Sequence, residues 1–158
     1  KGDKDRAYVE TALMAQRLGR TPILVVDRFP ELDLIIRVSR ELGIRPHIGV
    51  RARLTTKSVG KWADSSGERS KFGLSAAEIV EAVDRLKAEK MLDCLELMHF
   101  HIGSQITDIH AIKESMREAM RQFQHLKTLS VGLSRKVRAN SEIRAAIPEL
   151  SVVAPSGE

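Results

Sequence analysis

Two histidines and a Gly-Ser pair stand together near the middle of the chain, in the stretch LMHFHIGSQ (97–105). His99 and His101 alternate along an apolar run, so they point to the same face if that run is a strand. The run then breaks into Gly103 and Ser104, a turn that offers backbone N–H groups and a hydroxyl to an anion such as phosphate. An imidazole beside a phosphate can stack on a planar ring that carries it. The alternative is that these histidines are satisfied core residues.

Two arginines form a second candidate site. Arg51 and Arg53 lie on one face of the apolar run HIGVRARL (47–54), by the same alternation. Burying two unpaired guanidinium groups is costly. They therefore either meet carboxylates such as Asp27 or serve a bound anion. The remaining alternative is that the strand ends early and both side chains lie in water.

The other chemical signals are weaker. The long Ser-, Gly- and Lys-rich segment 55–75 is of a length that is usually functional or disordered. It has neither the GxxxxGK[ST] order nor the GxGxxG order of common phosphate-binding loops. Cys94 lies in an apolar run and is interpreted as a core residue rather than a nucleophile. No His, Cys or acidic cluster has the spacing of metal ligands, so no metal site is predicted from the residues.

The elements that must position these residues follow from alternating helical and strand periodicity. Strands are expected at 22–27, 47–54 and 94–102, and helices at about 4–18, from Pro30 to Gly43, from Ser75 with Glu78 in capping-box spacing, and from about Asp108. Repeated helical crossovers imply an α/β fold with a parallel sheet and helices outside it. Asp27, the loop after Leu54 and the stretch HIGSQ all fall at the carboxyl ends of these strands, where such sheets place their functional groups.

Composition narrows the class of protein. The chain has 158 residues, enough for one ordinary domain, with 42% hydrophobic and 30% charged residues. The net charge is +5, but basic and acidic residues are interleaved and aromatics are only 4%, so no nucleic-acid partner is predicted. No apolar run approaches a membrane span, so no membrane association is predicted. A single cysteine excludes an internal disulfide framework and fits a reducing, cytoplasmic compartment.

The two ends of the chain differ from its middle. The start, KGDKDRAY, has no Met and no apolar h-region, so it is not interpreted as a signal peptide, and we treat the chain as a fragment. The α/β rhythm stops at about residue 127. Residues 127–158 hold a basic patch at Arg135–Arg138 and two prolines, and they show no pattern of a further buried strand.

Four stretches together resemble the biosynthetic arginine decarboxylases: KDRAYVETAL, GVRARL, GERSKFGLS and LDCLELMHFHIGSQ. These enzymes belong with the ornithine and diaminopimelate decarboxylases, which bind pyridoxal phosphate in an alanine-racemase-like barrel. The resemblance implies a partial (β/α)8 barrel of the alanine racemase-like, pyridoxal-phosphate-binding type at 1–126. Residues 127–158 would be a divergent, non-native tail, for which a frameshift or a splice is one explanation.

The resemblance also implies roles for the candidate residues. His101 would stack on the pyridine ring, and Ser104, in the turn with Gly103, would bind the phosphate of pyridoxal 5'-phosphate. Arg51 or Arg53 would lie close to the cofactor, and which of the two stays open. The family also suggests Mg²⁺. The reaction implied is loss of CO₂ from arginine to give agmatine, in polyamine (putrescine and spermidine) biosynthesis, by a homo-oligomer.

Two departures from the family pattern limit this chain. The Schiff-base lysine of the family lies upstream of the first residue, so no catalytic residue is assigned here. The glycine-rich phosphate loop expected soon after residue 127 is replaced by LSVGLSRKVRANSEIR. We therefore expect the isolated chain to be inactive, marginally stable and prone to associate. The alternatives are a non-enzymatic α/β domain that binds a phosphate ligand, or an interaction protein that uses the basic tail.

Overall fold

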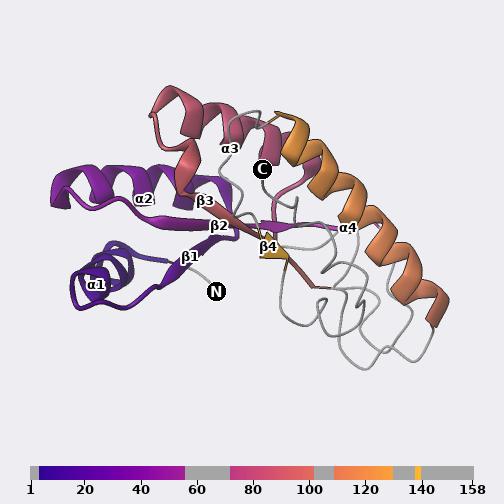
Figure 1. The fold of residues 1–158 in the computed structure, drawn as a ribbon, viewed down its shortest axis with the longest axis horizontal. Coiled ribbons are helices and arrows are strands. Elements are labelled where there is room, and N and C mark those ends of the chain that lie inside the picture. Colours follow the sequence, from indigo (N-terminus) through magenta and orange to yellow (C-terminus); the bar gives the residue numbers. More distant parts are fainter. Residues whose placement is uncertain (1–3, 56–71, 102–108, 130–137, 140–158) are drawn as a thin grey trace, which may run out of the picture.

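The computed structural model describes residues 4–55, 72–101, 109–129 and 138–139 (Figure 1). Along the chain these residues form the following elements: α1 (Arg6–Arg17), β1 (Ile23–Val26), α2 (Phe29–Leu42), β2 (His47–Ala52), α3 (Ala76–Ala88), the 3-10 turn η3 (Leu92–Cys94), β3 (Leu95–Phe100), α4 (Ile109–Leu129) and β4 (Arg138–Ala139). The predicted alternation of helices and strands is confirmed. The three predicted strands are shorter than predicted by two or three residues.

The strands form one parallel sheet in the order β1-β2-β3-β4. Each strand therefore lies beside the strand that follows it in sequence, and all carboxyl ends meet at one edge. The register joins Val25 to Gly49 and Gly49 to Leu97, with an irregularity between Ile48 and Gly49. The predicted parallel α/β architecture is confirmed.

Local signals begin and end the helices. The side chain of Ser75 caps α3, and Glu78 reaches back to the cap backbone, so the predicted capping box is formed. Pro30 lies in the first turn of α2, and Gly43 ends that helix in the left-handed conformation with φ of 64°. Asp5 caps α1 by accepting a hydrogen bond from the Tyr8 N–H at 2.8 Å.

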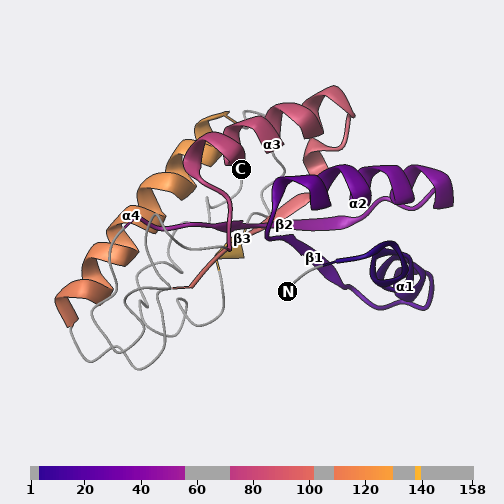
Figure 2. The ribbon, with the colours of Figure 1, turned by 180° about the vertical axis from the view of Figure 1, so that it is seen from behind.

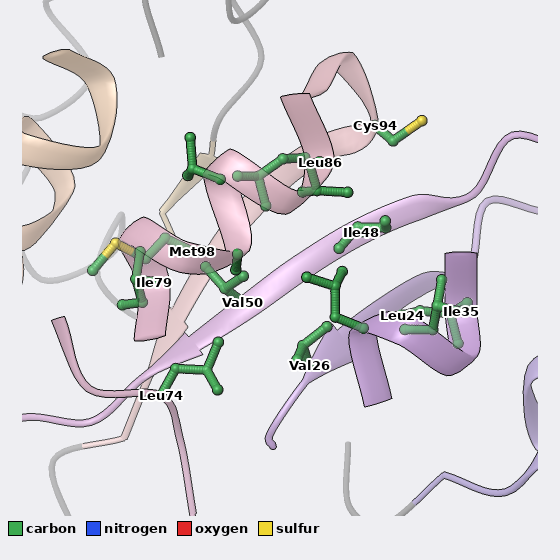
Figure 3. Close-up of a cluster of buried hydrophobic side chains, with 14 of the residues drawn as sticks. Leu24, Val26, Ile35, Ile48, Val50, Leu74, Ile79, Leu86, Cys94 and Met98 are labelled. Carbon is green, nitrogen blue, oxygen red and sulfur yellow. The ribbon is translucent and has the colours of Figure 1, made fainter. Parts of the chain in front are cut away.

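One face of the sheet packs against helices α2 and α3 to form the core (Figure 3). Alternate residues of the strands point to this face and are almost fully buried: Leu24, Val26, Ile48, Val50 and Met98. They meet apolar side chains of the helices: Ile35 of α2, and Ile79 and Leu86 of α3. Burial of this apolar surface stabilises the sheet, and it therefore fixes the positions of the residues at the carboxyl ends of the strands.

The opposite face of the sheet is closely packed in its middle layer. A Cβ atom at Gly49 would lie 3.2 Å from both the Leu97 Cβ and a methyl carbon of Val25. A side chain at this position would therefore crowd the Val25 and Leu97 side chains, which lie on either side of Gly49. Two residues further along the strands, polar side chains replace the apolar ones.

The segment 127–158 contributes the last residues of α4 and the two-residue strand β4. Strand β4 pairs with β3 at Leu97 and Met98, an element that the sequence pattern did not predict. Helix α4 lies beside α3, as the view from behind shows (Figure 2). Among the helices of the described residues, none combines the length and hydropathy needed to cross a bilayer.

Candidate functional site

Three polar residues lie in a row across the carboxyl ends of β1, β2 and β3. Asp27 directly follows β1, and Arg51 of β2 is paired in register with His99 of β3. The Arg51 Nη1 donates to the Asp27 Oδ1 at 3.0 Å. The Asp27 side chain is 3% exposed and that of Arg51 is 20% exposed. The alternative in which an arginine meets Asp27 is thus confirmed for Arg51.

The residues that follow the long loop close the edge beside Arg51. The Phe72 ring lies over the Arg51 guanidinium, with 5.4 Å between the Cζ atom and the ring centroid. The Gly73 N–H donates to the Asp27 carbonyl at 3.1 Å, and the Leu74 N–H donates to the Arg51 carbonyl at 2.7 Å. The returning chain is therefore joined to the ends of both β1 and β2.

Arg53 has a different environment from Arg51. Its Nη2 donates to the Glu78 Oε2 at 3.2 Å, in the capping box of α3. The same oxygen accepts the Ser75 N–H at 2.7 Å and the Ser75 hydroxyl at 2.8 Å. These Ser75 hydrogen bonds, and then the charge of Arg53, hold the pKa of the Glu78 carboxyl below its ordinary value of 4.5. Arg53 thus serves the start of a helix, whereas Arg51 lies in the polar row.

A buried ion pair lies behind Asp27. The Lys4 Nζ lies 2.9 Å from the Glu31 Oε2, and both side chains are at most 4% exposed. The same Glu31 oxygen accepts the backbone N–H of Asp27 at 2.8 Å. Glu31 stands in the first turn of α2, where the helix dipole favours a carboxylate.

The two histidines differ in exposure. His99 is 4% exposed, whereas His101, the residue after β3, is exposed. The interpretation of a core residue thus fits His99, and His101 remains accessible to a ligand. Gly103 and Ser104 lie outside the described residues, as does most of the predicted loop, 56–71.

Side chains of helix α4 form hydrogen bonds with the residues that follow β2. The Glu118 Oε1 accepts the Thr55 N–H at 2.6 Å and the Thr55 hydroxyl at 2.7 Å, and Glu118 is 7% exposed. The Gln122 Nε2 donates to the Arg53 carbonyl at 3.3 Å. The start of the long loop is therefore fixed, like its end.

Cys94 is buried, and burial raises the pKa of its thiol, which supports the interpretation of a core residue. In the described part of the chain, no group of three or more His, Cys, Asp or Glu side chains is placed to hold a metal ion.

Sequence reasoning missed several residues around the site: Lys4, Glu31, Phe72 and Glu118. Phe72 stands in SKFG, a stretch noted for its resemblance but given no role. Glu31 could have been found from its place in the first turn of a predicted helix. Lys4 and Glu118 carry no local signal, because their partners lie 27 and 63 residues away.

A parallel sheet with helices on one face, and polar residues at the carboxyl ends of its strands on the other, defines part of an α/β protein, a class that generally places its ligand sites at that edge. Residues 2–136 match the family described as pyridoxal-dependent decarboxylase, pyridoxal binding domain, and the chain belongs to this family.

Relatives within the family are arginine decarboxylases. The chain is 59% identical over 118 residues to the biosynthetic arginine decarboxylase of Gloeobacter violaceus, covering 75% of the chain and 18% of the relative. It is 52% identical over 132 residues to that of a Nostoc species, covering 84% and 19%. The chain thus spans about a fifth of the length of these relatives.

Solved structures agree with this placement. The biosynthetic arginine decarboxylase from Campylobacter jejuni has a TM-score of 0.72 and 32% identity, over 87% of this chain and 21% of that one. Diaminopimelate decarboxylase from Helicobacter pylori, complexed with L-lysine, has a TM-score of 0.71 and 27% identity, over 86% and 32%. The predicted partial barrel of the pyridoxal-phosphate-binding type is confirmed. None of these matches supports the two non-enzymatic alternatives.

Proposed function

We propose that this chain is the section of an arginine decarboxylase that forms one side of its pyridoxal phosphate site. The whole enzyme would convert arginine to agmatine and CO₂. The observation that carries the proposal is the row of Asp27, Arg51 and His99 at the carboxyl ends of three adjacent strands. The similarity to arginine decarboxylases over three quarters or more of the chain supports the choice of substrate.

The described residues fit this cofactor. Pyridoxal phosphate has a flat ring and a dianionic phosphate, so it needs an accessible planar group and donors for an anion. His101 is exposed just beyond β3, and Arg51 keeps a fifth of its side chain exposed although Asp27 is its partner. His101 would lie against the ring, and Ser104 with Gly103 would bind the phosphate.

Of the two candidate arginines, we assign Arg51 to the cofactor site. It is aligned with His99 in the ladder, and Asp27 and Phe72 orient its guanidinium from two sides. Arg53 is engaged by Glu78 and the start of α3. Arg51 would therefore add positive charge beside the bound cofactor, and Arg53 would hold the helix that supports β2.

When bound, the cofactor supplies an electron sink for the electrons released as CO₂ leaves. This chain supplies orientation and electrostatics. Val25, Gly49 and Leu97 pack closely below the site, and the polar row two residues further along the strands would lie beside the ligand. The lysine that links the cofactor, and the groups that select arginine, would come from other parts of the enzyme.

A chimeric enzyme tests the proposal. The 118 matched residues of the Gloeobacter violaceus decarboxylase are replaced by those of this chain. We expect agmatine formation and binding of pyridoxal phosphate. In this chimera, Arg51→Met should weaken cofactor binding by roughly tenfold to a hundredfold, the scale of a hydrogen bond to a charged group.

Arg53→Met in the same chimera is the matched control. It should change cofactor affinity by less than about threefold, because its effect is confined to the start of α3. A folded chimera that does not bind pyridoxal phosphate would contradict the proposed function. A larger effect from Arg53→Met than from Arg51→Met would reverse the assignment.

Further expectations follow from the same family. We place the whole enzyme in polyamine biosynthesis and in the cytoplasm, where the free Cys94 stays reduced. We also expect a homo-oligomer with arginine as the small-molecule substrate. Mg²⁺ would bind to residues other than those that the structure describes. Treating the chimera with a chelator tests whether its activity depends on Mg²⁺.

A further inference from the structure

We propose that Glu31 is a positioning residue for Arg51, acting through the backbone of Asp27, with Lys4 neutralising its buried charge. The inference relies on the proposed function only where it assigns Arg51 to the cofactor site. The contacts themselves, and the measurement that tests them, do not involve the cofactor.

The contacts form a continuous line from the start of the chain to the site. Lys4 binds the Glu31 Oε2, which accepts the N–H of Asp27, whose side chain binds Arg51. Each group except Arg51 is at most 5% exposed. Water is therefore a poor substitute for any of these partners, and loss of one leaves a buried group unsatisfied.

Glu31 contacts the backbone at the point where the chain leaves β1. Asp27 lies directly after Val26, the last residue of β1 in the printed register with β2, and its N–H donates to the Glu31 Oε2 at 2.8 Å. Residue 28, the N-cap of α2, makes no side-chain capping bond. The carboxylate of Glu31 thus holds the N–H side of the Asp27 backbone where the chain turns from strand to helix.

Holding the backbone of Asp27 also sets the direction of its side chain. The Asp27 carbonyl accepts the Gly73 N–H at 3.1 Å, so its peptide groups are held on both sides. Its carboxylate then reaches Arg51 at 3.0 Å from a fixed origin. If the N–H contact is lost, we expect the residue to shift and the guanidinium to lose a well-placed partner.

The test compares two double variants of the full 158-residue chain. Lys4→Met with Glu31→Gln removes the ion pair but keeps an oxygen that can accept the Asp27 N–H. Lys4→Met with Glu31→Leu removes the ion pair and the acceptor. Replacing a buried ion pair by neutral groups of similar size is often tolerated, whereas removing one partner alone leaves a buried charge.

The measurement is the rate at which phenylglyoxal modifies Arg51, followed by peptide mass mapping. We expect the Leu variant to react roughly fivefold faster than the unaltered chain, the scale of one net hydrogen bond. The Gln variant should react at the unaltered rate. Asp27→Asn, which weakens the direct partner of Arg51, is the positive control and should also speed the reaction.

An arginine elsewhere separates positioning from general loosening. Arg85, an exposed residue paired with Asp33 at 3.0 Å, should keep its rate in all variants. Equal Arg51 rates in the two double variants would overturn the proposal, and so would a faster rate for Arg85 in step with Arg51. If the Leu variant does not fold, the Gln variant still decides, because a faster Arg51 reaction there would overturn it.

Failure of the proposed function would look different. A chimera without pyridoxal phosphate binding, together with the expected Arg51 rates, would remove the cofactor role but leave the positioning by Glu31. In a chimera that is active, the Leu variant should weaken cofactor binding and the Gln variant should not.

Discussion

The carboxylate of Glu78 accepts hydrogen bonds from the start of a helix and from the end of a strand. Ser75 donates to it through its N–H and its hydroxyl, and Arg53 donates from β2. All of these contacts favour the ionised form, so the pKa of Glu78 is lowered in the folded chain. A carboxyl whose pKa is lower in the folded state stabilises that state above the ordinary pKa and ceases to do so as the pH falls through the folded value.

This predicts a contribution of Glu78 to acid sensitivity. The unaltered chain should lose stability as the pH falls from 4.5 toward the lowered pKa, and Glu78→Gln should show a smaller loss in that window. Urea unfolding at a series of pH values measures it. Glu81→Gln, an exposed change on the same helix, is the control and should follow the unaltered chain. The same pH dependence in both variants would contradict the prediction.

At this scale the sequence predicts faces better than partners. Alternation along the strand placed Arg51 and Arg53 on one face. In the structure both side chains are partly buried and paired with carboxylates, so the alternative in which both lie in water is wrong. Alternation could not separate them, because their partners come from different elements: Asp27 after β1 and Glu78 at the start of α3. The roles of Gly103 and Ser104 stay predictions.

Between the elements, the segment Phe72–Leu74 has a tightly constrained backbone. Gly73 has φ of +86°, and a Cβ there would lie 3.1 Å from the Arg53 nitrogen and 3.2 Å from the Arg51 carbonyl oxygen. These neighbours are backbone atoms of β2 and the residue after it, so they cannot move aside as a flexible side chain could. The segment therefore needs glycine both for its dihedral angle and for its close approach.

Gly73→Ala should destabilise the chain more than Gly43→Ala. Gly43 also has a positive φ, of +64°, but no atom lies within 4 Å of a Cβ built there. We expect about 1–2 kcal/mol for the backbone strain that both share, and about 1–3 kcal/mol more at Gly73 for the overlap. Urea denaturation of the two variants measures the difference. Equal losses would show that β2 can yield at this point.

Element prediction succeeded where the signal is local. The capping box at Ser75 and the glycine that ends α2 are both present, because each depends on residues a few positions apart. The irregular register between Ile48 and Gly49 was not predicted, because it depends on how β3 packs beside β2. Nor was β4, since two residues in a segment rich in arginine and serine form no periodic pattern.

For the whole molecule, the share of the relatives' length is the important fact. The chain spans about a fifth of the length of the arginine decarboxylases to which it is similar, so most of the length of those proteins has no counterpart in it. Under the proposed function, the site would form only one wall of the cofactor pocket. Association with further strands is expected, because β1 is an edge of the described sheet and its Ile23 is 38% exposed.

The isolated chain should therefore form no agmatine from arginine with pyridoxal phosphate added, and should associate as its concentration rises. Product analysis by mass spectrometry tests the first expectation, with the chimera as positive control. Sedimentation velocity tests the second, and Ile23→Lys should reduce association because a charge on an edge strand opposes pairing. Turnover by the isolated chain would contradict the first expectation.

The sequential strand order also bears on synthesis. Because β1, β2 and β3 are neighbours in the order in which a ribosome makes them, each new strand can dock on the one just completed. At each of these stages the strands already made form a continuous sheet, and the next strand adds at one edge of it. Such vectorial assembly would let this wall take shape before its downstream partners are translated.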